Sequence, residues 1–524
     1  MAGECRLGVG AEVVAKGGLC LLALGSVARG AGLSSGPGGR RAGTLFGLIA
    51  ALTIAAYFNF GQFHGPRLAH HWEQFHYFLG SRYFPELGYD GLYVASVAAQ
   101  RESLPRYPVQ KRVRDLRTNQ MAAIRDLDTH AAEVRARFSP ERWRSFLADN
   151  RFFLTANPSH YIELIRQDHG YNPTPTWTFV ARMLGSRWLS PSRGTQTALG
   201  LLDPLLLAVA FAAVFRVFGS GVGCTAVILF GLGYPWRYYW VGGAFLRQDW
   251  FVAFILAACA LRRGRHGTAG ALVGYATMVR VFPVLFLFGP AILAIRAGAR
   301  RESLRPWVRL ATGFCLAVLL GLAAGALAGR GPAAWSEFAH NLEKHRATWL
   351  TNNVGLRNLA LYGNETLHNE LIDASLPEPW GPWKQEMQRR YQERRALVWL
   401  LAALLLLPTA AAAWRAAPHE ALILGMVPIF ALLDITWYYW VMLVALALWR
   451  SRGPALGVLV LNGVLFGLHY CWADELAGGL SYAVMGGVMS LGLLILFLGW
   501  VLPGWVDAVW RRPIVPLADP GGTP

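Results

Sequence analysis

The stretch GALVGYATMVRVFPVLFLFGPAILAIRAG, residues 270–298, is apolar almost throughout, and it decides the fold class. A membrane-spanning helix needs about 20 apolar residues, so this stretch is too long for a single crossing. Pro283 lies near its middle, and a proline breaks a helix because it lacks the backbone N–H and clashes with the preceding turn. The stretch therefore predicts a helical hairpin in a membrane, with Arg280 at the bend.

The composition of the whole chain agrees with a membrane protein. Of 524 residues, 54% are hydrophobic and 15% are charged, whereas soluble domains carry about a quarter charged residues. Most arginines behind the net charge of +18 lie in short connectors or in one long loop. This distribution indicates membrane topology and contact with anionic membrane lipids, and it argues against nucleic-acid binding. The six cysteines form no CxxC pair, so neither a disulfide framework nor a cysteine metal site is predicted.

Further apolar runs predict about 10–13 transmembrane helices in total. The predicted spans lie near residues 43–60, 197–217, 221–241, 245–261, 268–281, 282–295, 307–329, 396–414, 419–436, 437–449, 454–470 and 480–503. Arginine clusters fall on one side of this arrangement, at residues 40–41, 262–265, 296–309, 415, 450–452 and 511–512. Short loops rich in Lys and Arg stay in the cytoplasm, so this side and both chain termini are predicted to be cytoplasmic.

The fold class predicted is an all-α polytopic membrane protein with two large extracytoplasmic loops that carry juxtamembrane helices. Its parts are a cytoplasmic N-terminal segment (1–42), a first transmembrane helix (43–60), a first loop (61–196), a block of transmembrane helices (197–329), a second loop (330–395), C-terminal transmembrane helices (396–503) and a cytoplasmic tail (504–524). An apolar patch at residues 18–27 is too Gly-rich for a signal peptide. A charged insertion at residues 101–150 predicts a solvated helix.

The first loop begins with HHWEQFHYFLGSRYFPELGYDGLY, residues 70–93, which is dense in histidines, acids and aromatics. On a helix, Glu73, His76 and Tyr77 share one face, and a partly desolvated carboxylate beside an imidazole is a plausible general base. Asp90 follows in a glycine-containing turn. The alternative is that these rings anchor a helix at the headgroups and that the acids are ordinary solvated residues. The histidines show no strict ligand spacing, so no metal site is predicted.

Three further stretches carry candidate substrate-binding residues. In RQDHGYNPTPTW, residues 166–177, a proline-rich turn follows Asp168, His169 and Asn172 and leads into an amphipathic interfacial helix. In FLRQDWF, residues 245–251, the charged residues Arg247 and Asp249 bind substrate or form a mutual salt bridge. The second loop contains basic side chains suited to a phosphate or a sugar, at His340, His345, Arg346 and Arg357. Arg280 marks a functional site or reaches the lipid headgroups.

These motifs, taken in order, resemble the GT-C superfamily of polytopic glycosyltransferases over most of residues 43–450. The resemblance is closest to the bacterial mannosyltransferases that use polyprenol-phosphate-mannose. WEQFHYFLG is similar to the acid–aromatic pattern that opens the family's first loop, and YNPTP to its Tyr-Pro turn. Arg280-Val281-Phe282-Pro283 is similar to its Lys-x-x-Pro hairpin. Glu replaces the family's Asp, Arg replaces its Lys, and residues 101–150 are inserted.

The resemblance implies an inverting sugar transfer from a polyprenyl-phosphate donor to an envelope glycan or lipid acceptor, without a cofactor. In such enzymes a carboxylate deprotonates the acceptor and basic residues stabilise the departing phosphate. Glu73 is then the base, with Asp90 and Asp168 as rivals, while His76 and Tyr77 orient the base or the acceptor. Arg280 binds the lipid phosphate, assisted by Arg247 or by the second loop.

Three other classes of protein remain as alternatives. A transporter or flippase needs polar residues at the centre of the bilayer, whereas most acids here lie near the ends of spans, Asp203 and Asp434 excepted. An O-antigen polymerase or ligase also uses large outer loops and basic residues. A non-catalytic scaffold would use the charged insertion to bind a partner. The outer compartment is a periplasm or an ER lumen, and the Ala/Gly/Arg-rich composition favours a bacterial inner membrane.

Overall fold

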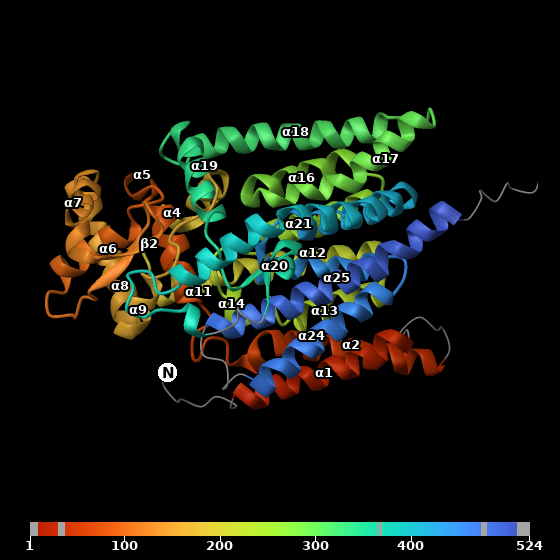
Figure 1. Cartoon of the computed structure of the whole chain (residues 1–524), viewed down its shortest axis with the longest axis horizontal. Helices are drawn as coiled ribbons and strands as arrows, with labels where there is room; N and C mark the ends of the chain where they lie inside the picture. The colour runs from red at the N-terminus through yellow and green to blue at the C-terminus, as the bar shows by residue number, and fades with distance from the viewer. Residues whose placement is uncertain (1–8, 30–36, 364–365, 367–368, 473–478, 511–524) are drawn as a thin grey trace, which may run out of the picture.

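The computed structural model describes residues 9–29, 37–363, 366, 369–472 and 479–510, so most of the predicted tail lies outside the described residues. Almost all regular structure is helical, and the strands among these residues form two short antiparallel pairs. Figure 1 shows a bundle of long helices with a smaller helical domain at one end. The fold is therefore that of an all-α polytopic membrane protein, as predicted.

Seven helices in the described part of the chain are long and apolar enough to cross a membrane. They are Gly10–Arg29, Arg193–Phe218, Phe282–Ala299, Arg305–Ala326, Gly381–Arg415, Gly453–Cys471 and Ser481–Leu502. Shorter apolar helices pack among them, at Arg41–Tyr57, Ser220–Gly231, Pro418–Leu432 and Trp437–Leu448. The helices α15 (Asp249–Arg262) and α16 (His266–Arg280) complete the bundle. Each span that the sequence predicts therefore coincides with a helix or a pair of short helices.

The helix α1 (Val9–Arg29) is a candidate span that the sequence analysis did not assign. Its glycines make the apolar run look weak, yet it packs along α2 (Pro37–Tyr57) and α24 (Gly453–Trp472). The buried Lys16 ammonium donates hydrogen bonds to Glu12 (2.6 Å) and to Asn59 (2.7 Å). Because Asn59 lies between α2 and the first loop, α1 begins at the loop end of the bundle. The segment 1–42 thus contains a helix that is long and apolar enough to cross a membrane.

The predicted helical hairpin is present, and its bend lies at Val281. The helix α16 ends at Arg280, Val281 has a φ of +61°, and a 3₁₀ turn, η5 (Phe282–Leu287), leads into α17 (Phe288–Ala299). A β-branched residue at positive φ is rare, so the surrounding packing must hold this bend in place. The helix α18 (Arg305–Ala326) lies against α16, where a Cβ on Gly270 would stand 1.9 Å from the Leu310 carbonyl oxygen.

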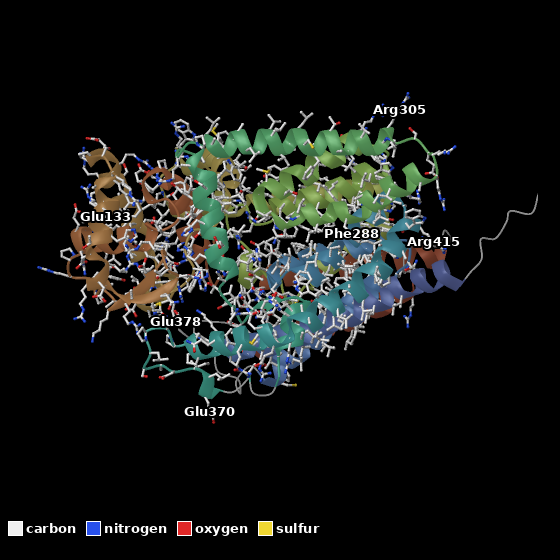
Figure 2. The ribbon with its side chains drawn as sticks, turned by 45° about the horizontal axis from the view of Figure 1, so that its top comes forward. Glu133, Phe288, Arg305, Glu370, Glu378 and Arg415 are labelled. Carbon is white, nitrogen blue, oxygen red and sulfur yellow. The ribbon has the colours of Figure 1, made fainter. Side chains whose placement is uncertain are left out.

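The two ends of the bundle differ in charge. Figure 2 shows Arg305 and Arg415 at one end, and Glu133 and Glu378 towards the other. Further helices of the bundle are α12 (Leu202–Phe218), α13 (Ser220–Gly231), α21 (Gly381–Arg415), α22 (Pro418–Leu424), α23 (Met426–Leu432), η8 (Trp437–Leu448) and α25 (Gly479–Trp510). The chain thus carries a basic end and a loop end, which is the asymmetry that the arginine clusters predict.

The first loop folds into the domain at the loop end. Its helices are α3 (His71–Gln74), η2 (Phe75–Leu79), α4 (Gly80–Arg82), α5 (Phe84–Leu87), α6 (Leu92–Ser103), η3 (Ile124–Leu127), α7 (Asp128–Ala136), α8 (Pro140–Ala156), α9 (Ser159–Ile165), α10 (Pro175–Ala181) and η4 (Arg182–Ser186). The charged insertion is only partly helical, which corrects the prediction. Its first half is a β-hairpin, β1 (Arg112–Asp115) and β2 (Gln120–Ala123), closed by Asn119 at a φ of +61°. Asparagine tolerates this left-handed conformation better than most residues do.

The second loop covers the domain from the other side. It contains α19 (Ala333–Arg346), α20 (Leu356–Leu361), the turn η7 (Asn369–Leu371) and the first turns of α21. A short pair of strands, β3 (Asn353–Val354) and β4 (Ile435–Thr436), ties it to the start of η8. One buried pair joins the two loops, since Glu378 binds Arg114 of β1 (3.1 Å); Lys384 of the same loop also binds Glu378 (3.0 Å). The two loops therefore enclose one region above the loop end of the bundle.

Candidate active site

An ion pair between Glu73 and Arg247 lies where the first loop meets the bundle. The Arg247 Nε atom is 2.9 Å from Glu73 Oε2, and 3% of the arginine side chain and 14% of the glutamate side chain is exposed. Glu73 is on α3, the first helix of the loop domain. Arg247 belongs to the irregular segment that precedes α15. Two parts of the chain that are remote in sequence thus meet at this pair.

Asp203 fixes the backbone that carries Arg247. Its carboxylate, in the first turn of α12, accepts hydrogen bonds from the backbone N–H of Arg247 (2.8 Å) and of Gln248 (3.1 Å). The preceding residue, Leu246, adopts a φ of +52°, which turns the chain sharply before α15 begins. The buried acid therefore orients the segment that carries Arg247.

Arg247 is also surrounded by tyrosines. Its guanidinium donates to the Tyr77 hydroxyl and to the Tyr438 hydroxyl (3.0 Å), and it lies 4.4 Å from the centre of the Tyr77 ring. The Tyr77 hydroxyl in turn donates to Asn172 Oδ1 (3.1 Å). These contacts bring three predicted site residues together around one cation. Tyr438, at the start of η8, is an addition that nothing in its apolar, aromatic sequence context distinguishes.

A second cation, Arg280, pairs with Asp249. The distance between Arg280 Nη2 and Asp249 Oδ1 is 3.8 Å, and the arginine also donates to the Leu246 carbonyl (3.1 Å). The Tyr275 hydroxyl donates to the same aspartate (3.0 Å). The mutual salt bridge between Arg247 and Asp249, considered from the sequence, is therefore wrong, because each residue has another partner. Arg280 is buried at the bend and does not extend to lipid headgroups.

Asp168 and His76 lie beside Glu73 without binding it. Asp168 accepts hydrogen bonds from Trp72 Nε1 (2.7 Å) and from the His169 backbone N–H (2.8 Å). His76 Nδ1 lies 2.9 Å from the Trp72 carbonyl, so it carries the proton, and Nε2 (2.7 Å) accepts from the Tyr93 hydroxyl. Both imidazole nitrogens are thus occupied. His76 therefore forms no direct carboxylate–imidazole pair with Glu73.

The two central acids have opposite pKa shifts. Burial raises the pKa of Glu73 above its ordinary value of 4.5, although Arg247 opposes this effect. Burial would also raise the pKa of Asp168, but His76, His169 and the hydrogen bond from Trp72 outweigh it and lower that pKa. Burial lowers the pKa of His169 to about 3. Of the two acids, Glu73 is the stronger base.

Other predicted residues lie at the edge of this cluster or have separate partners. The His345 ring is 6.0 Å from the His169 ring, so α19 contributes to the cluster. Asp90 faces His130 (3.7 Å) and Arg137 (3.8 Å) instead. Arg357 forms an ion pair with Asp434. His340 and Arg346 are exposed on α19.

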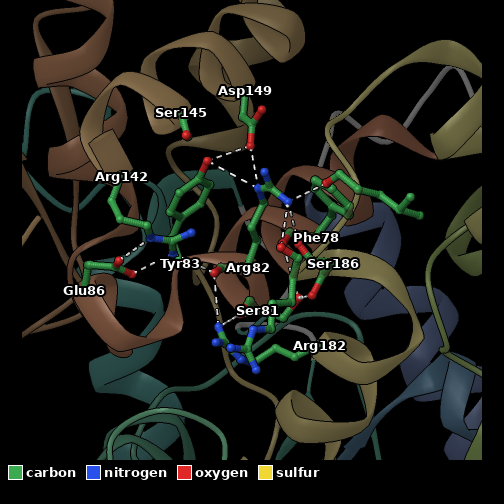
Figure 3. A network of polar contacts seen from close by, with 12 residues as sticks. Phe78, Ser81, Arg82, Tyr83, Glu86, Arg142, Ser145, Asp149, Arg182 and Ser186 are labelled. Carbon is green, nitrogen blue, oxygen red and sulfur yellow. Dashed lines mark hydrogen bonds and ion pairs between the residues drawn. The ribbon is translucent and has the colours of Figure 1, made fainter. Parts of the chain in front are cut away.

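A buried polar network holds the motif residues 70–93 in place, as Figure 3 shows. Arg82 binds Asp149 of α8 (2.7 Å) and donates to the Ser186 carbonyl (3.0 Å). The Glu86 carboxylate accepts two hydrogen bonds from Arg142 (2.6 and 3.0 Å). The contacts of Arg82 and Glu86 therefore fix the C-terminal end of the short π-helix η2, which carries His76 and Tyr77. The acid at position 86 is structural.

No group of three or more His, Cys, Asp and Glu side chains that could hold a metal ion occurs among the described residues. The cations of the cluster are arginines. Chemically, the cluster offers the Glu73 carboxylate with its raised pKa, the buried guanidinium groups of Arg247 and Arg280, and several aromatic faces. Such a set can remove a proton from a hydroxyl and bind an anion beside it.

Residues 250–433 match the model of glycosyltransferase family 87. The matched region extends from α15 to the end of the bundle segment before η8, about a third of the chain, and it includes Arg280. Glu73, Asp168 and Arg247 precede it. The match supports a membrane glycosyltransferase of the GT-C type. No protein of curated function and no solved structure matches the chain.

Proposed function

We propose that this protein transfers a sugar, mannose in the simplest case, from a polyprenyl-phosphate donor to an envelope glycan or lipid acceptor, with inversion. The observation that carries the proposal is the buried Glu73–Arg247 pair, with Arg280 near it, at the junction of the bundle and the loop domain. A lipid-linked donor has its reactive carbon at the membrane surface, and a site where the loop domain meets the apolar helices suits such a donor. The family match supports the same class of enzyme.

In the proposed reaction, Glu73 removes the proton from the acceptor hydroxyl. The acceptor oxygen forms a bond to the anomeric carbon from the face opposite to the phosphate. The bond between that carbon and the phosphate oxygen breaks, and the electron pair leaves with the polyprenyl phosphate. Arg247 and Arg280 stabilise the negative charge on the leaving phosphate, an electrostatic effect that is strong in a buried site.

Arg247 has a double role in this proposal, because it is the ion-pair partner of Glu73 in the free protein. The donor phosphate attracts the same guanidinium, and Arg–phosphate contacts are strong charge-assisted hydrogen bonds. Binding of the donor therefore weakens the ion pair between Arg247 and Glu73. Since Arg247 lowers the pKa of Glu73, its withdrawal makes the carboxylate a better base when the donor is in place.

The proposed location is the bacterial inner membrane. The basic end of the bundle faces the cytoplasm by the positive-inside rule, and the two loops with the site face outwards. The envelope acceptor and the outward-facing donor then meet on the same side. Asp90 and the exposed residues of α19 remain candidates for acceptor contacts, because they border the region between the two loops.

The test is sugar transfer from synthetic polyprenyl-phosphate donors by the purified protein in nanodiscs. Wild-type protein should transfer the labelled sugar, and Glu73→Gln should lose about 10²–10⁴-fold of the rate, the usual contribution of a general base. Glu133→Gln, an exposed acid on α7, is the matched control and should retain the wild-type rate. A full rate in Glu73→Gln would assign the base to another acid. Counterflow of lipid or solute, with no transfer from any donor, would favour a transporter.

A further inference from the structure

A cavity lies at the basic end of the bundle, remote from the candidate active site. Its volume is about 590 Å³, and it is lined by the ends of α21 and η8, the start of α24 and the middle of α25. The lining includes two arginines, Arg415 and Arg450, two tryptophans, Trp449 and Trp500, and apolar residues such as Ile495. The cavity thus combines a cationic rim with an apolar wall.

The two arginines are available to an anion to different degrees. Among the described residues, the Arg415 side chain has no hydrogen-bond or ion-pair partner, and it is exposed at the last turn of α21. The Arg450 guanidinium stands 3.7 Å from the buried Glu420 carboxylate and remains 57% exposed. Gly453 begins α24 at the same rim, and the first N–H groups of a helix have no partner within it. The rim therefore carries an excess of positive charge.

The apolar wall continues towards the lipid-facing surface. Ile495 on α25 is 63% exposed, and Leu404 and Leu407 on α21 are 56% and 66% exposed. Helices α21 and α25 pack side by side. Trp449 and Trp500 contact each other edge to face, with ring centres 4.9 Å apart, and tryptophan is enriched at the level of the lipid headgroups. An acyl chain can therefore lie along the two helices while its headgroup occupies the cavity.

We propose that this cavity binds one anionic phospholipid from the leaflet on the basic side of the membrane. Basic pockets between transmembrane helices on the cytoplasmic side suit anionic headgroups. The phosphate sits between Arg415, Arg450 and the start of α24, and the chains follow the exposed leucines. Free phosphate is also an anion, but it has no acyl chain to contact the apolar wall. This inference is independent of the proposed sugar transfer.

The experiment measures lipid binding to the full-length protein by native mass spectrometry, with phosphatidylglycerol and phosphatidylcholine compared. Wild-type protein should prefer phosphatidylglycerol. Arg415→Gln should weaken that lipid about fivefold, the usual effect of one basic residue near an anionic lipid surface. Arg309→Gln, an exposed arginine of α18 at the same end, should not.

A second variant changes the cavity without changing charge. Gly499 lines it, and a Cβ there meets nothing within 4 Å, so Gly499→Leu fills the space without strain in its surroundings. It should also weaken the binding of phosphatidylglycerol. Equal affinity for the two lipids, or equal losses in Arg415→Gln and Arg309→Gln, would overturn the proposal. Displacement of the lipid by inorganic phosphate would overturn it too, since the site would then bind free phosphate.

Discussion

Removal of either charge of the Glu73–Arg247 pair should destabilise the protein, and removal of both should restore part of the loss. At a separation of 2.9 Å and an effective dielectric constant of about 20, the attraction within the pair is about 6 kcal/mol. Desolvation of two buried charges cancels much of this, so the net contribution is small. A single substitution, by contrast, leaves one buried charge unpaired and costs about 3–5 kcal/mol.

The expected melting temperatures follow from the size of the chain. Unfolding entropy is about 2 cal/mol/K per residue, so in 524 residues each kcal/mol lowers Tm by about 1 °C. Glu73→Gln and Arg247→Gln should each lower Tm by about 3–5 °C. The double variant should lower it by less than the sum of the two. The Tm of the wild type and of the three variants can be measured by tryptophan fluorescence, in the same detergent and at one fixed heating rate.

Across the wild type, the two single variants and the double variant, the rate of sugar transfer should not change in parallel with the melting temperature. The double variant regains stability but still lacks the carboxylate, so sugar transfer should stay about 10²–10⁴-fold below wild type. A double variant whose Tm loss equals the sum of the single losses would show that the two charges are not coupled. Recovery of activity together with stability would assign Glu73 a structural role only.

Three further predictions concern the site and the bundle. The pH profile of kcat/KM should rise with pH through an apparent pKa above 4.5, because burial raises the pKa of Glu73 and the base must be deprotonated; a profile flat down to pH 4 would contradict this. Asp168→Asn should reduce transfer by less than Glu73→Gln in parallel rate assays, since Asp168 is already held by two hydrogen bonds. Gly270→Leu should cost about 1–3 kcal/mol of stability, seen as a lower Tm with an unchanged pH profile, because its side chain would meet the Leu310 carbonyl.

The membrane fold could be predicted from local features of the sequence. The length of an apolar run can be read directly from the sequence, and the arginine clusters indicate which helix ends lie at the same end of the bundle, so neither inference requires knowledge of distant contacts. The bend after Arg280 follows in the same way from Pro283. The span formed by α1 was missed because its glycines and Lys16 dilute an apolar run that packs against α24. The hairpin β1–β2 was missed because charged residues on both faces obscure its two-residue period.

The sequence predicts which residues belong to the candidate site, but it does not predict which of them contact each other. Arg247 and Asp249 are two positions apart, but Arg247 lies in the irregular segment before α15 and Asp249 begins that helix, so their spacing does not reveal their partners. Their real partners, Glu73 and Arg280, come from segments whose approach depends on how the loop domain sits on the bundle. Tyr438 joins the cluster for the same reason.

The buried acids of this protein fall into structural and candidate catalytic groups according to the hydrogen-bond and ion-pair partners of each carboxylate. Glu86 is bound twice by one arginine, Asp203 twice by backbone N–H groups, and Asp168 by an indole and a backbone N–H. These bonds fix the geometry, and a ligand cannot replace them without unfolding the local structure. Glu73 differs, because its ion-pair partner Arg247 is a group that a phosphate can also bind. An acid held by an exchangeable cation can be released when substrate arrives, which is what a base coupled to donor binding requires.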